Sequence, residues 1–226
     1  MTAHAESTRA RRRHSAGEAT RELLMVTAER LIALNGVEGV ALREIQAAAG
    51  QSNSSVITYH FGSQAGLVRA VLEFRYRKIN ARRAELLQQA RDRGVSGDPR
   101  EAVWIIVRPL IESIDAGEMF VPFLARLSED PRARVDYWPD HLEDEWTQER
   151  LEELVDAALQ DLPERIRRGR TFQLYIGLIS VLAAAARSGR GMSEAQLHNY
   201  VDTWVGMLTA PVSYETRALM SESPND

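Results

Sequence analysis

The sequence contains no cysteine, which excludes a disulfide framework, a thiolate zinc site and a cysteine nucleophile. Proline is scarce, and no segment alternates apolar with polar residues between tight turns, so we expect no sheet. Long apolar runs are also lacking. The longest, 174–186, has 13 residues, whereas a helix needs about 20 to cross a bilayer. We therefore expect a helical protein without a membrane partner.

The opening segment, "MTAHAESTRARRRH", has no apolar core of the kind that a secretory signal requires. Together with the absence of cysteine, this favours a cytoplasmic location. The overall composition, 44% hydrophobic and 27% charged, is that of an ordinary globular protein whose 226 residues can bury a sizeable core.

Charge is distributed unevenly along the chain. Residues 1–83 carry 13 Lys and Arg against 7 Asp and Glu, whereas residues 84–226 carry 15 against 25. A basic front and an acidic remainder favour a polyanionic partner for the front alone. The alternative is chance clustering combined with a solvated tail.

Recurrence of apolar residues every 3.6 positions predicts an all-α protein with nine helices. We expect a disordered basic arm over 1–16 and then a first helix from about 17 to 35, with one apolar face formed by Leu23, Leu24, Thr27, Leu31 and Leu34. Two short helices follow, and a long one spans 64–91. Further helices are expected over 99–115, 118–128, 140–160, 163–187 and 193–210, with an irregular segment at 129–139 and a flexible tail at 213–226.

The stretch "NSSVITYHFGS", residues 53–63, is too polar for a core helix. It follows the short helix "ALREIQAAAG" after a tight turn, which is the pattern of a helix-turn-helix. In that motif the second of the two helices enters the major groove of DNA. One face must then be buried through Val56, Ile57 and Phe61, while the other stays polar to meet base edges and phosphates.

Two segments carry a resemblance to the DNA-binding domain of the TetR/AcrR family of transcriptional regulators. They are "ATRELLMVTAERLIALNGVEGVALREIQAAAG" and "YHFGSQAGLVRAVL". The resemblance covers about the first 75 residues. It implies a helix-turn-helix domain over 17–66, a helix at 64–91 that links the domains, and a helical ligand-binding and dimerisation domain over 67–212.

The resemblance also implies roles for single residues. Tyr59 falls where the family contacts base edges, and His60 and Arg43 fall where it contacts phosphates. The full predicted DNA-binding set is Arg43, Ser52, Asn53, Ser54, Ser55, Thr58, Tyr59, His60 and Gln64. The chain departs from the family pattern in having Ala41 for Thr or Ser, Gln64 for Lys, Thr58 for Tyr, and a turn one residue longer. The run Arg9 to Arg13 is either a minor-groove arm or a solvated tail.

The second half of the chain is rich in aromatic residues, which favours a small-molecule pocket over a plain bundle core. Arg108, Gln173 and His141 are the candidate polar groups, and a buried Arg108 would indicate an anionic ligand. The predicted ligand-binding set is Trp104, Arg108, Phe120, Phe123, Trp138, His141, Trp146, Phe172 and Gln173. Tyr137 and Tyr175 belong to the same aromatic cluster.

The last two long helices carry more apolar residues than one face needs. Paired with their symmetry mates, they would form a four-helix dimer interface, the alternative being intramolecular core. The predicted interface set is Phe172, Ile176, Ile179, Ala183, Val201, Trp204, Val205 and Leu208. A dimer is favoured because two half-sites of a pseudo-palindromic operator need a two-fold protein.

His141 and Glu145 are four residues apart, a spacing that can bind a metal on one helical face. A solvated acidic face explains the same segment better, and we expect no metal, no cofactor and no catalytic residues. The sequence thus predicts a homodimeric, DNA-binding repressor that a small molecule releases from double-stranded operator DNA. The alternatives are a ligand-independent dimeric DNA-binding protein and a helical metal-dependent enzyme.

Overall fold

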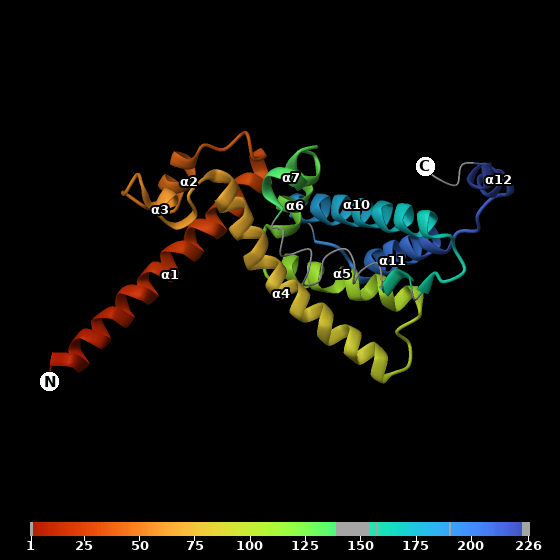
Figure 1. Ribbon diagram of the computed structural model, residues 1–226, viewed down its shortest axis with the longest axis horizontal. Helices are drawn as coiled ribbons and strands as arrows, with labels where there is room; N and C mark the ends of the chain where they lie inside the picture. Colours follow the sequence, from red (N-terminus) through yellow and green to blue (C-terminus); the bar gives the residue numbers. More distant parts are fainter. Residues whose placement is uncertain (1, 139–153, 157, 190, 223–226) are drawn as a thin grey trace.

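The structure is a computed structural model that describes residues 2–138, 154–156, 158–189 and 191–222, and within these residues it contains helices and no strand. Figure 1 shows a small N-terminal group of helices joined by a long helix to a larger bundle. The helices are α1 (Thr2–Asn35), α2 (Leu42–Ala48), α3 (Val56–Phe61), α4 (Gln64–Asp92), α5 (Pro99–Asp115), α6 (Phe120–Ser128), α7 (Ala133–Tyr137), α10 (Glu164–Ser188), α11 (Glu194–Thr209) and α12 (Tyr214–Glu222).

The N-terminal group is formed by α1, α2 and α3 around the first turns of α4. Its core contains Leu24, Ile32, Ile45, Ile57 and Leu67, each of which is almost completely buried. These side chains come from all four helices, so the short α2 and α3 are held by tertiary packing rather than by their own helix propensity.

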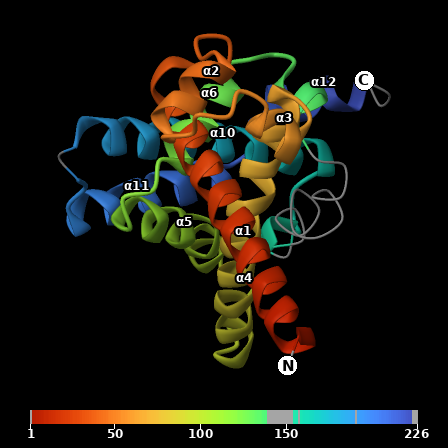
Figure 2. The ribbon, with the colours of Figure 1, turned by 90° about the vertical axis from the view of Figure 1, so that its left-hand side faces the viewer.

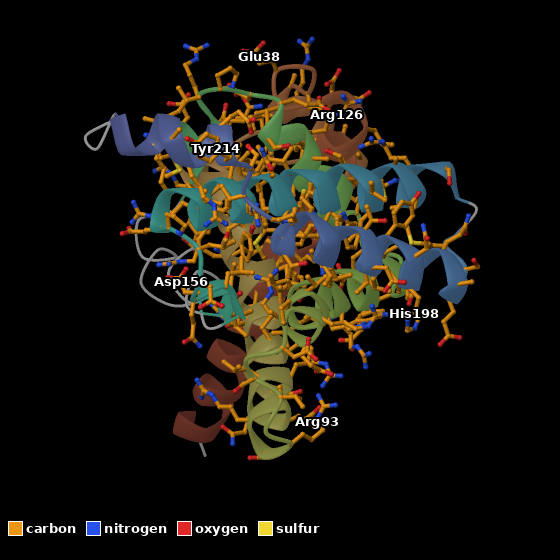
Figure 3. All side chains as sticks on the ribbon, turned by 90° about the vertical axis from the view of Figure 1, so that its right-hand side faces the viewer. Glu38, Arg93, Arg126, Asp156, His198 and Tyr214 are labelled. Carbon is orange, nitrogen blue, oxygen red and sulfur yellow. The ribbon has the colours of Figure 1, made fainter. Side chains whose placement is uncertain are left out.

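The larger group packs α5, α6, α10 and α11 against one another and against α4. Figure 2 shows α10 and α11 running side by side across the bundle, while α4 extends below it. Figure 3 shows the same pair from the opposite side, where α10 and α11 lie in front of the other helices. Because α4 packs against both α1 and α5, one continuous helix connects the two groups. The division into 17–66 and 67–212 therefore stays an interpretation.

Two helices begin with a serine cap. The hydroxyl of Ser63 accepts a hydrogen bond from Gly66 N at 3.0 Å, and that of Ser193 accepts one from Gln196 N at 3.2 Å. Each hydroxyl satisfies a backbone donor that the first helical turn leaves unpaired. Asp98 caps α5 in the same way through Arg100 N.

Three segments are helical where the sequence predicted no helix. α1 begins at Thr2, inside the segment 1–16, whose Ala, Arg and Glu content favours a helix. The segment 129–139 is not wholly irregular, since it contains α7. The tail forms α12, which projects away from the bundle in Figure 1. The predicted helix over 140–160 lies mostly outside the described residues.

The predicted apolar face of α1 is only partly correct: Leu24 is buried and Leu31 packs against the core. Leu23 and Leu34 are about half exposed, and the buried side is formed by Leu24, Met25, Ala28, Glu29, Ile32 and Ala33. The face is rotated because α1 packs against both α4 and α6, which a helical wheel cannot show.

Candidate nucleic-acid interface and ligand cavity

The turn between α2 and α3 is set by local hydrogen bonds and by glycine. Gly50 follows α2 with a φ of 66°, a conformation that glycine adopts without strain. The side chain of Asn53 accepts a hydrogen bond from Ser55 N at 3.0 Å, and Asn53 O accepts one from Val56 N at 3.2 Å. Asn53 thus forms a turn just before α3, whose N-cap residue is Ser55 and has no side-chain cap.

α3 buries one side and exposes the other. Val56 and Ile57 are buried and Phe61 is partly buried, so the predicted inner face is confirmed. On the outer face, Tyr59 is 83% exposed, and Ser52, Asn53, Ser54, Ser55 and Thr58 are also exposed.

His60 and Arg43 extend this outer face. His60 is half-buried, and its ring packs edge-on against Tyr59 with the ring centroids 5.0 Å apart. Arg43 on α2 is exposed. The geometry brings together eight of the nine predicted DNA-binding residues as a polar surface, and their contacts with DNA stay a prediction.

Gln64 is the exception within this set. Its side-chain amide donates to Val37 O at 2.9 Å and to Val40 O at 3.2 Å. These bonds tie the loop between α1 and α2 to the first turn of α4. We therefore assign Gln64 a positioning role, because its donors are already used inside the domain.

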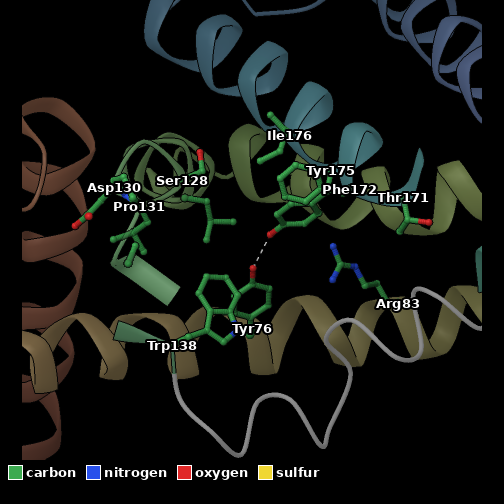
Figure 4. A pocket seen from close by; sticks show the side chains of 13 residues that line it. Tyr76, Arg83, Ser128, Asp130, Pro131, Trp138, Thr171, Phe172, Tyr175 and Ile176 are labelled. Carbon is green, nitrogen blue, oxygen red and sulfur yellow. Dashed lines mark hydrogen bonds between the residues drawn. The ribbon is translucent and has the colours of Figure 1, made fainter. Parts of the chain in front are cut away.

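A cavity of about 360 Å³ lies between α4, α6, α7 and α10. Figure 4 shows its side chains converging from these helices. The lining is mainly apolar, as in most small-molecule sites. The lining residues are Tyr76, Arg83, Leu124, Leu127, Ser128, Asp130, Pro131, Ala133, Trp138, Thr171, Phe172, Tyr175 and Ile176.

Two tyrosines and an arginine are the main polar groups on the inner side of this cavity. The hydroxyls of Tyr76 and Tyr175 lie 2.7 Å apart and share a hydrogen bond (Figure 4). Burial raises the pKa of both phenols, that of Tyr76 well above its ordinary value. Arg83 is 1% exposed, and burial lowers the pKa of its guanidinium.

Of the predicted ligand-binding residues, Trp138 and Phe172 line the cavity. Phe120 and Phe123 are core residues, and Phe120 packs edge-on against Tyr76. Trp104, Arg108 and Gln173 do not line this cavity, and their role in ligand binding stays a prediction: Arg108 is exposed over the Trp104 ring, and Gln173 is exposed on α10. His141 and Trp146 lie outside the described residues.

Tyr76 and Arg83 were not among the predicted ligand-binding residues; they lie on α4, which was predicted to link the domains. The one signal in the sequence that could have identified them is the 3.6-residue periodicity of α4, which indicates the face that is buried. It places Tyr76, Ile79 and Arg83 on one face, and all three are buried.

The predicted dimer stripe is largely intramolecular core. Ile179, Ala183, Val201, Trp204 and Leu208 are buried within the subunit, where α10 and α11 pack together. Of the remaining three, Val205 and Ile176 are half-buried, and Phe172 is 65% exposed at the cavity. These side chains, which the sequence assigned to a contact with a partner subunit, are therefore buried by helices of the same subunit.

A different face of α10 is uncovered. By length and composition α10 is apolar enough to span a membrane, yet only 28% of its most apolar 18-residue window is buried. Core helices of soluble proteins can have the same length and composition. Gln173, Ser180 and Ala184 are exposed on one side, with Gly177 partly exposed between them. Thr203 and Gly206 are exposed on α11.

Metal-binding groups do not gather in the described part of the chain, where no cluster of three His, Asp or Glu side chains occurs. The pair His141 and Glu145 lies outside the described residues.

Comparisons with known proteins agree with this geometry. Residues 24–71 match the family model described as bacterial regulatory proteins, tetR family. The HTH-type transcriptional repressor AcnR of Corynebacterium glutamicum is 30% identical over 183 residues, which cover 77% of this chain and 87% of AcnR. The crystal structure of the TetR family transcriptional regulator PfmR from Thermus thermophilus superposes with a TM-score of 0.52 at 16% identity, covering 84% of this chain and 98% of PfmR. The helix-turn-helix with its polar outer face, the similarity to AcnR over most of the chain and the shared all-α fold show that this chain belongs to the TetR family of DNA-binding transcriptional regulators.

Proposed function

We propose that this regulator is a cytoplasmic, homodimeric repressor that binds a pseudo-palindromic operator and is released by a small molecule, without catalysing a reaction. The observation that carries the proposal is the combination of an exposed polar α3 with a separate apolar cavity against α4. The relative AcnR is described as a repressor, which favours repression over activation.

The outer face of α3 supplies the contacts with DNA. Tyr59 and Thr58 are presented to base edges, and Arg43, His60 and the serines at 52, 54 and 55 to phosphates and sugars. Small hydroxyl side chains suit this position, because they donate and accept hydrogen bonds without holding α3 away from the groove.

A dimer formed through α10 and α11 supplies a second copy of the DNA-contacting helix α3. Exposed Ser180 and Ala184 and partly exposed Gly177 on α10, with exposed Gly206 on α11, are small enough to allow close approach of the same helices from a second subunit. The two α3 helices would then enter successive major grooves, roughly 34–36 Å apart.

α4 connects the cavity to the DNA-contacting helix α3. Tyr76 and Arg83 line the cavity, while the first turn of the same helix packs against α3. A ligand that fits better when α4 is displaced shifts the population towards dimers with the wrong spacing for the operator. The cavity favours this mechanism over the ligand-independent alternative.

The test is selection of genomic DNA fragments by the purified full-length protein at physiological salt. Wild-type protein should enrich fragments that share a pseudo-palindrome, and Tyr59→Ala should lose them. Tyr214→Ala is the matched control, because Tyr214 is as exposed as Tyr59 but lies on α12. Binding without sequence preference that survives Tyr59→Ala would overturn the proposed role of α3.

A further inference from the structure

Arg83 is a buried cation without a counter-ion among the described residues. Its side chain is 1% exposed, and its Nε has no hydrogen-bond partner. Nη1 reaches Asn80 Oδ1 at 3.5 Å and Nη2 reaches Ile106 O at 3.4 Å, both at the limit for a hydrogen bond. A buried guanidinium with such weak partners is costly for the folded state.

Arg75, two turns earlier on α4, is a buried arginine that does have carboxylate partners. It forms ion pairs with Glu29 at 2.5 Å and with Glu118 at 2.7 Å. Arg83 has no such carboxylate in the described part of the chain, and it lines the cavity whereas Arg75 does not. The unsatisfied cation is therefore located where a ligand can reach it.

The other residues that line the cavity indicate which chemical groups a ligand bound at Arg83 would carry besides its negative charge. Figure 4 shows Arg83 beside the paired hydroxyls of Tyr76 and Tyr175, with Asp130 on the far side of the tyrosines. Leu124, Leu127 and Trp138 contribute apolar walls. A second negative charge on the ligand would approach Asp130 and be repelled, which favours a single anionic group on an apolar body.

We propose that the effector of this regulator is an amphiphilic monocarboxylate, its carboxylate bound by Arg83 and its apolar body packed between α4, α6 and α10. The inference rests on the proposed ligand-responsive function and specifies the class of ligand. The guanidinium can turn towards a carboxylate without losing a strong bond, because its present contacts are long. Arginine and carboxylate then form a charge-assisted, two-pronged pair.

The test compares acids with neutral alcohols of the same carbon skeleton, by titration calorimetry on the purified full-length protein. The probes are octanoate against 1-octanol and 3-phenylpropanoate against 3-phenylpropan-1-ol. At least one acid should bind about 10- to 100-fold more tightly than its alcohol, the range expected for one charge-assisted contact. The two pairs distinguish a flexible aliphatic body from an aromatic one.

Arg83→Met is the informative variant, because methionine fills a similar space without the charge. It should abolish the preference for the acid while raising the thermal midpoint of the ligand-free protein, since a buried unpaired cation has been removed. Arg82→Met is the matched control. Arg82 is the preceding residue on α4, and its guanidinium pairs with Glu85 and Glu112 on the surface, so acid binding should be unchanged.

Equal binding of acid and alcohol, an unaltered preference in Arg83→Met, or binding of neither acid at millimolar concentration would each overturn the inference. The proposed function is tested separately by release of a selected operator fragment with neutral and cationic compounds. Release by a neutral compound that binds Arg83→Met equally well would refute the proposal of a carboxylate ligand. It would still support the proposal of a ligand-responsive repressor. Failure to select any operator would refute the repressor itself.

Discussion

Glu29 of α1 and Arg75 of α4 form a buried ion pair, with Arg75 Nε 2.5 Å from Glu29 Oε2. Glu29 also accepts a hydrogen bond from Met119 N at the start of α6, and Arg75 also pairs with Glu118. Burial raises the pKa of the Glu29 carboxyl, although the charge of Arg75 opposes that effect. One polar network therefore fixes the DNA-binding group to the bundle, and a displacement of α4 must move α1 with it.

Arg75→Ala should destabilise the protein by about 3–5 kcal/mol, because it leaves Glu29 as a buried unpaired charge. The measurement is urea unfolding of the full chain at neutral pH. Lys78→Ala is the control on the same helix: the exposed side chain of Lys78 pairs with Glu118 and should contribute less than about 1 kcal/mol. Equal effects of the two variants would contradict the buried network.

Gln64→Met should lower the free energy of unfolding by about 1–2 kcal/mol, since it removes the donor to Val37 O and Val40 O. Chemical denaturation in the absence of DNA measures this loss. Gln89→Met, at an exposed site on α4, should change stability little. A Gln64→Met variant that keeps full stability but binds the operator more weakly would instead support the predicted contact between Gln64 and DNA.

Gly66→Ala should destabilise the helix-turn-helix by about 1–3 kcal/mol, because a methyl group there would overlap the carbonyl of Phe61. Either α3 or the first turn of α4 has to move. Gly169→Ala is the matched change in α10, where an added methyl group meets no atom within 4 Å. It should stabilise the protein by up to about 1 kcal/mol, and thermal unfolding of both variants would show opposite shifts.

Stability should fall as pH rises above about 10, through the tyrosine pair. Burial raises the pKa of Tyr76 and Tyr175, so the unfolded chain loses these protons at a lower pH than the folded chain. The contribution is fully present below the unfolded pKa of about 10 and is lost above it. Spectrophotometric titration should show less phenolate near pH 10 from this pair than after unfolding, and Tyr175→Phe should reduce the difference.

Ala184→Arg should convert the proposed dimer to monomers, because it places a long cation in the middle of the exposed face of α10 that we assign to the interface. Light scattering coupled to gel filtration measures the mass of each species. Ala81→Arg adds the same side chain at an exposed position of α4 and should leave the dimer intact. A dimeric Ala184→Arg would place the interface elsewhere.

The sequence by itself determined the helix-turn-helix and most of the helix boundaries, because these depend on interactions between near neighbours. Ser63 and Ser193 cap the helices that they precede, and Val56 and Ile57 are apolar at the helical spacing that must be buried. The extreme exposure of Tyr59 follows from the same register. The positions of these features can be read from the local sequence, whereas the packing that holds α2 and α3 comes from the tertiary structure.

Tertiary structure alone decided which arginine is buried and which apolar stripe is core. Arg83, rather than Arg108, is enclosed, because α5 packs against α4 at Ile106 while the outer side of α5 is open at Arg108. Ile179 and Val201 are apolar enough for an interface, yet they are buried because α10 and α11 pack against each other within the subunit. Burial is a property of contacts between segments that are distant in the sequence, and local periodicity carries no information about which segments meet.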